Sequence, residues 1–185
     1  PAGPSVRERY APGLVPQGIS AELIAARWSI SREEMDHYAV LSHQRADRAR
    51  AAGQFKREIV PIVTAGGIVE EDETIRGGTT MERLATLKPA FESAEMIERY
   101  PHLGWHVTAG NASQITDGAA AMLLMSDQAA SRLGLRPRAR FVAFDVRGDS
   151  PVEMLTAPTP ATRKVLEKAR MTMGEIDHFE INEAF

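Results

Sequence analysis

The sequence contains no cysteine among its 185 residues. Disulfides, thiolate metal ligands and a cysteine nucleophile are therefore excluded within these residues. A large charge of either sign is also lacking, because 22 basic residues stand against 25 acidic ones and the net charge is −3. Such a balance provides no general attraction to nucleic acid or to an anionic membrane. The longest apolar run, residues 119–125, is far shorter than the roughly 18 residues of a membrane-spanning helix.

Targeting and metal-binding signals are absent as well. The N-terminal residues 1–4 lack the basic-then-apolar pattern of a signal peptide. His102 and His106 have i, i+4 spacing, but Pro101 and Gly104 argue against a helical metal site. We therefore predict a cytoplasmic protein that binds neither nucleic acid nor membrane and holds no metal or permanent cofactor.

Capping signals predict two helices near the N-terminus. Ser20 is a candidate cap for a helix through Trp28. Residues 31–34 form a capping box, which predicts a longer helix to about Ala52 with its stop at Gly53. Small and apolar residues recur along this second helix at helical spacing and form a stripe: Met35, Tyr38, Ala39, Ser42, Ala46 and Ala49.

The next segments mix strands and short helices. Residues 58–63 and 68–71 are predicted to form a hairpin around the turn at residues 65–67. A second capping box at residues 79–82 predicts a short helix. Residues 92–106 show no clear pattern. The first 104 residues are therefore expected to be mainly helical.

Strand and helix alternate over residues 105–185. Strands are predicted at residues 119–126, 138–146 and 178–181, and the first of these is predicted to be buried. Helical segments are predicted at residues 127–134, 160–169 (with Thr159 as cap) and 172–175. This alternation favours a layered α/β core. Because the sequence ends directly after a predicted strand, we expect it to be an internal segment of a longer chain.

Two motifs could carry chemistry. Residues 108–113 (Thr-Ala-Gly-Asn-Ala-Ser) have small side chains, which let a ligand approach the backbone closely, and they offer the polar groups of Asn111 and Ser113. A tight turn that leads into a strand is the alternative interpretation. Residues 182–185 (Asn-Glu-Ala-Phe) follow a predicted strand, where ligands bind in open α/β sheets. Asn182 could hold a water or an oxyanion there, or the motif could be an ordinary polar turn.

Together with other blocks, these motifs resemble the thiolase family. The blocks that carry the resemblance are residues 18–49, 54–61, 72–76, 84–91, 108–120, 158–161 and 182–185. Any one block is weak evidence, whereas so many in the family's order are specific. The match covers nearly the whole chain. Residues 92–106 look longer than the family's usual link between the blocks at 84–91 and 108–120, which favours a degradative subgroup.

The resemblance implies a thiolase-like layered α/β fold, represented here in part, with a mainly helical inserted loop domain. Residues 1–104 would form the loop domain, which covers coenzyme A. Residues 105–149 would end the N-terminal half of the fold, and residues 150–185 would begin its C-terminal half. An exposed apolar surface is expected for these 185 residues alone, so we predict poor solubility or partial unfolding of the isolated chain.

The resemblance also implies roles for five residues. Ser113 would contact the pantetheine arm of coenzyme A, and Arg76 would lie near its adenine end. Met154 would line the acyl pocket. Asn182 would orient a water in the oxyanion hole, with Phe185 beside it. A surface charge remains the alternative for Arg76, and ordinary packing remains the alternative for Met154.

The implied activity is acyl transfer between an enzyme cysteine and coenzyme A, either 3-ketoacyl-CoA thiolysis or acetyl-CoA condensation. Coenzyme A and acyl-CoA would be substrates, and the enzyme would be a homodimer or homotetramer. The family's two cysteines and catalytic histidine would lie outside residues 1–185, so this chain alone is predicted to be inactive. The alternative is a non-catalytic thiolase-like protein that binds acyl-CoA or lipid.

Overall fold

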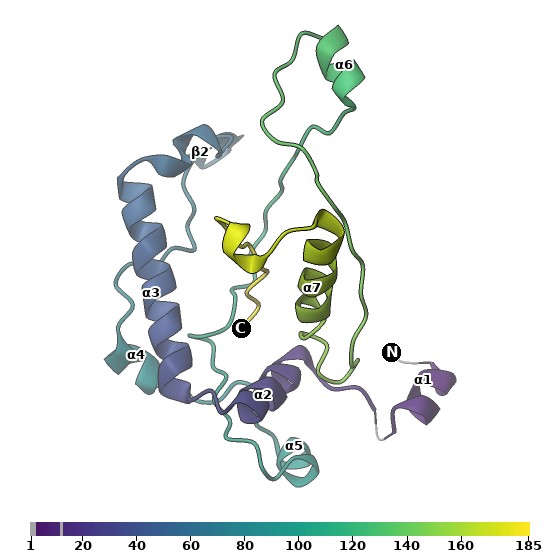
Figure 1. The fold of residues 1–185 in the computed structure, drawn as a ribbon. Coiled ribbons are helices and arrows are strands. Elements are labelled where there is room, and N and C mark those ends of the chain that lie inside the picture. The colour runs from purple at the N-terminus through teal and green to yellow at the C-terminus, as the bar shows by residue number, and fades with distance from the viewer. Residues whose placement is uncertain (1–2, 12) are drawn as a thin grey trace. The chain divides into compact units, whose positions relative to one another are not determined.

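The computed structural model describes residues 3–11 and 13–185 (Figure 1). The chain divides into two compact units. The first comprises the described residues up to Gln114 together with Glu183–Phe185, and the second comprises Ile115–Asn182. None of the described helices is long and apolar enough to cross a membrane.

The first unit is mainly helical, as the sequence predicts. Its elements in chain order are α1 (Pro4–Arg9), α2 (Gln17–Trp28), α3 (Arg32–Ala51), the 3₁₀ helix η1 (Gln54–Arg57), β1 (Ile62–Thr64), β2 (Gly67–Val69), α4 (Met81–Ala85) and α5 (Ala94–Arg99). The N-terminal end of α3 lies beside α4 (Figure 1).

The long helix α3 confirms the prediction from its capping box. The Ser31 hydroxyl accepts a hydrogen bond from the Glu34 N–H at 3.2 Å, and the Glu34 carboxylate accepts one from the Ser31 N–H at 2.8 Å. The helix ends before Gly53, whose φ of 69° suits glycine. By contrast, α2 begins at Gln17 rather than after the predicted cap Ser20, because the Pro16 carbonyl already accepts the first helical bonds.

The stripe of small and apolar residues on α3 is only partly buried. The buried residues of this helix are Asp36 and Val40 instead. Tyr38, in the middle of the stripe, is 54% exposed. The stripe is therefore only half-buried, and its exposed members are Tyr38 and Ser42.

The hairpin is present but shorter than predicted. β1 pairs with β2 in antiparallel register, from Ile62 opposite Val69 to Thr64 opposite Gly67. The Thr64 hydroxyl donates to the Gly67 carbonyl at 2.8 Å, which tightens the turn. All six strand residues are exposed, and no other described strand pairs with the hairpin.

Two short helices complete the first unit. Thr80, and not Thr79, caps α4 by accepting from the Arg83 N–H at 3.3 Å. Helix α5 lies within residues 92–106, where no element was predicted, and Ser93 caps it. The buried apolar residues of the first unit lie on α2, α3, α4, α5 and the loops beside them; they are Val15, Ile19, Ala21, Ala25, Val40, Leu84, Met96, Leu103 and Val107.

The second unit contains α6 (Asp127–Arg132), α7 (Pro158–Ala169) and the 3₁₀ helix η2 (Met173–Glu175). Ser126 caps α6, and Gly134 follows it with a φ of 64°, which confirms the predicted start and stop. The helical segment predicted at residues 172–175 is present as η2, and Thr172 and Glu175 form a capping box there. Helix α7 begins at Pro158, two residues before the predicted first position.

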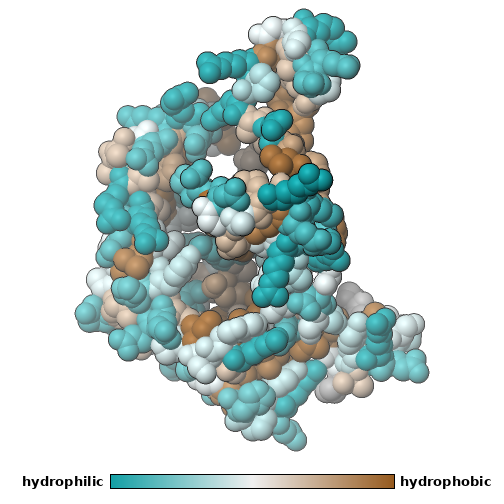
Figure 2. Space-filling model, in the orientation of Figure 1, coloured by the Kyte–Doolittle hydropathy of each residue, from teal (hydrophilic) through white to brown (hydrophobic). Residues whose placement is uncertain are grey.

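The three predicted strands of the second unit are absent, which corrects the sequence analysis. Residues 119–126, 138–146 and 178–181 pair with no other described strand, and β1–β2 is the sheet of the described residues. Their side chains are exposed, as with Leu123 at 77%, so the predicted burial of residues 119–126 is wrong. Apolar residues accordingly reach the surface in several places in Figure 2. A strand needs a neighbour for its backbone hydrogen bonds, and local sequence cannot provide one.

Candidate functional site

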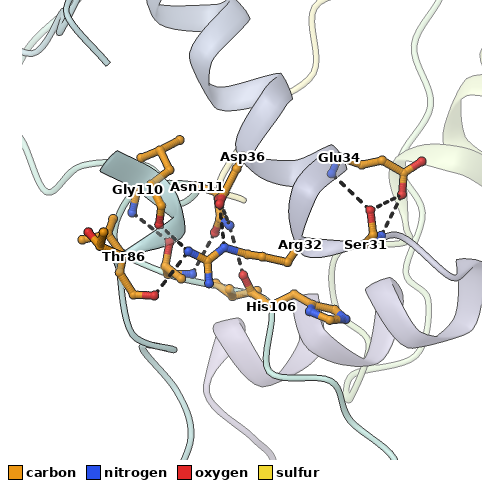
Figure 3. A network of polar contacts seen from close by, with 12 residues as sticks. Ser31, Arg32, Glu34, Asp36, Thr86, His106, Gly110 and Asn111 are labelled. Atoms are coloured by element: carbon orange, nitrogen blue, oxygen red, sulfur yellow. Dashed lines mark hydrogen bonds and ion pairs between the residues drawn. The ribbon is translucent and has the colours of Figure 1, made fainter. Parts of the chain in front are cut away.

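A buried polar network fixes the loop at residues 106–113 against α3 (Figure 3). The Asp36 carboxylate is 2% exposed and accepts from Arg32 Nε at 2.7 Å and from Asn111 Nδ2 at 2.9 Å. Asn111 Nδ2 also donates to the His106 carbonyl at 3.0 Å, while Asn111 Oδ1 accepts from the Thr108 N–H at 2.8 Å. The amide is thus used on both sides, and the loop has one favoured geometry.

Arg32 and Glu22 extend this network in two directions. The Arg32 guanidinium donates to the carbonyl oxygens of Leu84 and Leu87 at the end of α4. Glu22 on α2 is 1% exposed and accepts from the N–H groups of His106 at 2.9 Å and Val107 at 2.6 Å. Two buried carboxylates therefore hold one loop from two helices. Buried charges of this kind are tolerated where hydrogen bonds satisfy them.

Gly110 allows the loop to approach α4 closely. A Cβ at this position would overlap the side-chain ends of Leu84 and Leu87. The loop is also joined to the segment after α4 by the Ala90 N–H, which donates to the Val107 carbonyl at 2.9 Å. At Gly110 the close neighbours are therefore side chains of this chain, whereas the predicted close approach of a ligand to residues 108–113 stays a prediction.

A cleft of about 490 Å³ lies in the first unit between α3, this loop and residues 183–185. Its wall consists of Ile30, Glu34, Met35, Tyr38, Ala39, Ser42, His43, residues 110–114, Glu183 and Phe185. The incompletely buried stripe of α3 forms one side of it. The wall combines apolar side chains with hydroxyl, imidazole and carboxylate groups, as small-molecule sites do.

Two of the predicted site residues, Ser113 and Phe185, line this cleft. The Ser113 N–H donates to the Ala184 carbonyl at 2.9 Å, which brings the two chemical motifs together. The Phe185 ring packs edge-on against Phe91, with ring centroids 6.0 Å apart and an interplanar angle of 74°. Residues 183–185 are therefore part of the first unit although they end the chain.

Tyr38 and Glu183 form a contact across 145 positions of sequence. The Tyr38 hydroxyl donates to Glu183 Oε1. This hydrogen bond, followed by burial and by the negative charge of Glu183, raises the pKa of Tyr38 above its usual value. The hydroxyl is therefore a stable donor at neutral pH.

His43 lies on the cleft wall and contacts the segment that carries Arg76. Its Nδ1 accepts from the Arg76 N–H at 3.1 Å, so the ring proton of neutral His43 is on Nε2. Burial, and next the positive charge of Arg76, lower the pKa of His43. The ring is thus kept neutral. The hydrogen bond to His43 comes from the backbone of Arg76. Arg76 is exposed and is not among the residues that line the cleft.

The structure does not bring Met154 and Asn182 into the first unit. Both belong to the second unit and both are exposed, and Met154 has a positive φ of 28°. The sequence analysis missed Tyr38, His43 and Glu183 as residues of the cleft. An aromatic residue in a stripe of mostly small residues was the available signal for Tyr38.

A second cleft of about 370 Å³ lies beside the hairpin in the same unit. It is lined by Arg50, Gly53, Phe55, Lys56, Ile59, Pro61 and residues 70–72. Its basic and acidic groups face one space, which gives it no single charge preference. Among the described residues, no group of three or more histidine, aspartate or glutamate side chains is arranged to hold a metal ion.

Comparison with known proteins identifies the family. Residues 11–128 match the family described as "Thiolase, N-terminal domain", and residues 135–185 match "Thiolase, C-terminal domain". An acetyl-CoA acetyltransferase of Shinella zoogloeoides is 44% identical over 172 residues, which cover 91% of this chain and 41% of that protein. A steroid 3-ketoacyl-CoA thiolase of Mycobacterium tuberculosis is 44% identical over 96% of this chain and 40% of that protein.

A third relative gives the same result. A 3-ketoacyl-CoA thiolase of Cronobacter sakazakii is 43% identical over 98% of this chain and 46% of its own length. The chain thus spans less than half the length of these curated relatives. The family matches account for both units and for both chemical motifs, and the chain belongs to the thiolase family.

Proposed function

We propose that this chain is part of a thiolase that transfers an acyl group between an active-site cysteine and coenzyme A. The family match and the names of the relatives support this function, since those relatives are an acetyl-CoA acetyltransferase and 3-ketoacyl-CoA thiolases. The sequence has no cysteine, so the nucleophile would be supplied from outside these 185 residues. Thiolysis and condensation are the two directions of one reaction, which share the same covalent acyl-enzyme intermediate.

The single observation that carries the proposal is the cleft beside Ser113. Its volume of about 490 Å³ and its mixed wall suit the pantetheine arm of coenzyme A, which alternates amide and methylene groups. The Ser113 N–H is engaged by Ala184, while its hydroxyl has no hydrogen-bond partner in the part of the chain that the structure describes. That hydroxyl is therefore available to a ligand amide.

The remaining roles follow as part of the same proposal. Thioester attack develops negative charge on the carbonyl oxygen, and Asn182 would orient a water toward it. Phe185 would pack beside the reacting group, Met154 would line the acyl pocket, and Arg76 would lie near the adenine end of coenzyme A. The flexible thioether of a methionine suits acyl chains of different shape.

The proposed fold is the layered thiolase architecture, present here in part. Residues 1–104 would be the loop domain, residues 105–149 the end of the N-terminal half, and residues 150–185 the start of the C-terminal half. Strands at residues 119–126, 138–146 and 178–181 would form by pairing with strands from outside this segment. Their exposed apolar side chains are consistent with this, because such residues need a covering layer. The complete enzyme would be a cytoplasmic homodimer or homotetramer.

The test is acyl-transfer kinetics of the full-length protein with acetoacetyl-CoA and coenzyme A. We expect thiolysis, and we expect Ser113→Ala to raise the KM for coenzyme A about threefold to tenfold with little change in kcat, as for the loss of one hydrogen bond. The substitution leaves the backbone N–H of Ser113 in place, so its bond to Ala184 is kept. Absence of acyl transfer by the unmodified full-length protein would contradict the proposal.

A further inference from the structure

The short segment at residues 183–185 is fastened to the first unit by three different contacts. The Glu183 carboxylate accepts from the Tyr38 hydroxyl on α3. The Ala184 carbonyl accepts from the Ser113 N–H at 2.9 Å. The Phe185 ring packs against Phe91 with centroids 6.0 Å apart. Three consecutive residues are thus held by three separate parts of the chain.

Two of these anchors are themselves fixed by the buried polar network. Tyr38 lies two residues after Asp36 on α3, and Ser113 lies two residues after Asn111 on the loop. The Asp36 carboxylate accepts from Asn111 Nδ2 at 2.9 Å, so the helix and the loop are locked together. A rigid frame therefore presents both anchors to residues 183–185, as a positioned site requires.

Core packing does not explain the contact between Tyr38 and Glu183. Tyr38 is 54% exposed, and its side chain forms part of the cleft wall. Among the described residues, no basic side chain forms an ion pair with Glu183. The phenol hydroxyl is therefore the group that orients this carboxylate, and a hydrogen bond with a charged acceptor is a comparatively strong one.

We propose that Tyr38 is a positioning residue for acyl transfer, which acts by holding Glu183 and thereby the backbone of residues 182–185. This proposal rests on the proposed thiolase function. Asn182 is bonded directly to Glu183, so a loosened Glu183 frees the peptide that carries the Asn182 side chain. Small errors of placement in such groups lower the rate of the chemical step, whereas the binding of a substrate held elsewhere in the cleft is less affected.

The experiment compares Tyr38→Phe, Glu183→Ala and the double variant in the full-length protein. We expect Tyr38→Phe to lower kcat about tenfold while the KM for coenzyme A changes less than about twofold. The kcat of the double variant should be no lower than that of the more affected single variant, because both substitutions remove the same contact. Glu183→Gln, which keeps an acceptor oxygen, should recover most of kcat. Tyr100→Phe is the matched control, since Tyr100 lies outside the cleft.

Amide hydrogen exchange of Ser113, whose N–H donates to the Ala184 carbonyl, separates this proposal from the proposed function when it is measured without substrate. Exchange should be faster in Tyr38→Phe and unchanged in Tyr100→Phe. If the unmodified protein catalyses no acyl transfer, the proposed function is wrong, and the exchange result still decides whether Tyr38 holds the segment. Unchanged exchange, additive effects in the double variant, or a rise in KM without a fall in kcat would each overturn the positioning role.

Discussion

Replacement of Asp36 by asparagine isolates the charge of the buried network from its shape. The carboxylate is 2% exposed and accepts from Arg32 Nε at 2.7 Å and from Asn111 Nδ2 at 2.9 Å. In Asp36→Asn, one carboxylate oxygen becomes an NH₂ group. This NH₂ group would face the N–H of either Arg32 or Asn111. Two donors cannot form a hydrogen bond with each other, so at least one hydrogen bond is lost.

The expected loss follows from the burial of the partners. Hydrogen bonds to charged groups contribute about 1.5–3 kcal/mol each. The Arg32 side chain is 24% exposed, so water compensates part of its loss. We therefore expect Asp36→Asn to lower the free energy of unfolding by about 2–4 kcal/mol. Where the new NH₂ group faces Asn111, release of the loop that carries Ser113 should follow, because Asn111 then loses its acceptor on α3.

Asp47→Asn on the same helix is the matched control. Its partner is Arg50, and the two side chains are 42% and 33% exposed. Exposed pairs of this kind contribute about 0–1 kcal/mol. Urea unfolding followed by circular dichroism gives both free energies in the full-length protein. Equal, small losses for the two variants would refute the argument that the buried network holds the loop.

Two further predictions concern pH and packing. Because burial and Arg76 lower the pKa of His43 below its ordinary value of about 6.5, the folded state binds fewer protons than the unfolded state just below that pH. The contribution of His43 to the free energy of unfolding should therefore be fully present above about pH 6.5 and be lost as the pH decreases below it. In urea titrations at several pH values, His43→Gln should remove this contribution to the loss of stability at low pH. Gly18→Ala gains about 1 kcal/mol of helix propensity but places a Cβ into the Phe91 ring, at a cost of about 1–3 kcal/mol. We expect a net loss of stability of about 1 kcal/mol, and a higher melting temperature of the variant would contradict the overlap.

Features that depend on neighbouring residues could be predicted from the sequence. The capping box at residues 31–34 and the stop at Gly53 define α3 within a residue, because both act through hydrogen bonds and dihedral angles of nearby backbone. The helical turn at residues 172–175 is predicted for the same reason. The hairpin is found through its turn, although its strands end where no further partner continues the pairing.

Features that depend on distant residues could not be predicted in this way. The segment at residues 138–146 has strand-forming side chains, yet no described strand pairs with it. The spacing of Tyr38 predicts its place on the helix, whereas its hydroxyl hydrogen bond is to Glu183, 145 positions away in the sequence. The motifs around Ser113 and Phe185 were found by resemblance, and their meeting in one cleft required the structure.

The most direct test of the central claim is hydrogen exchange of the full-length protein with and without coenzyme A. The account predicts slower exchange in the presence of coenzyme A at residues 110–114 and along the cleft side of α3, from Met35 to His43. Protection confined to the second cleft, around Arg50 and residues 70–72, or no protection in the first unit, would contradict it.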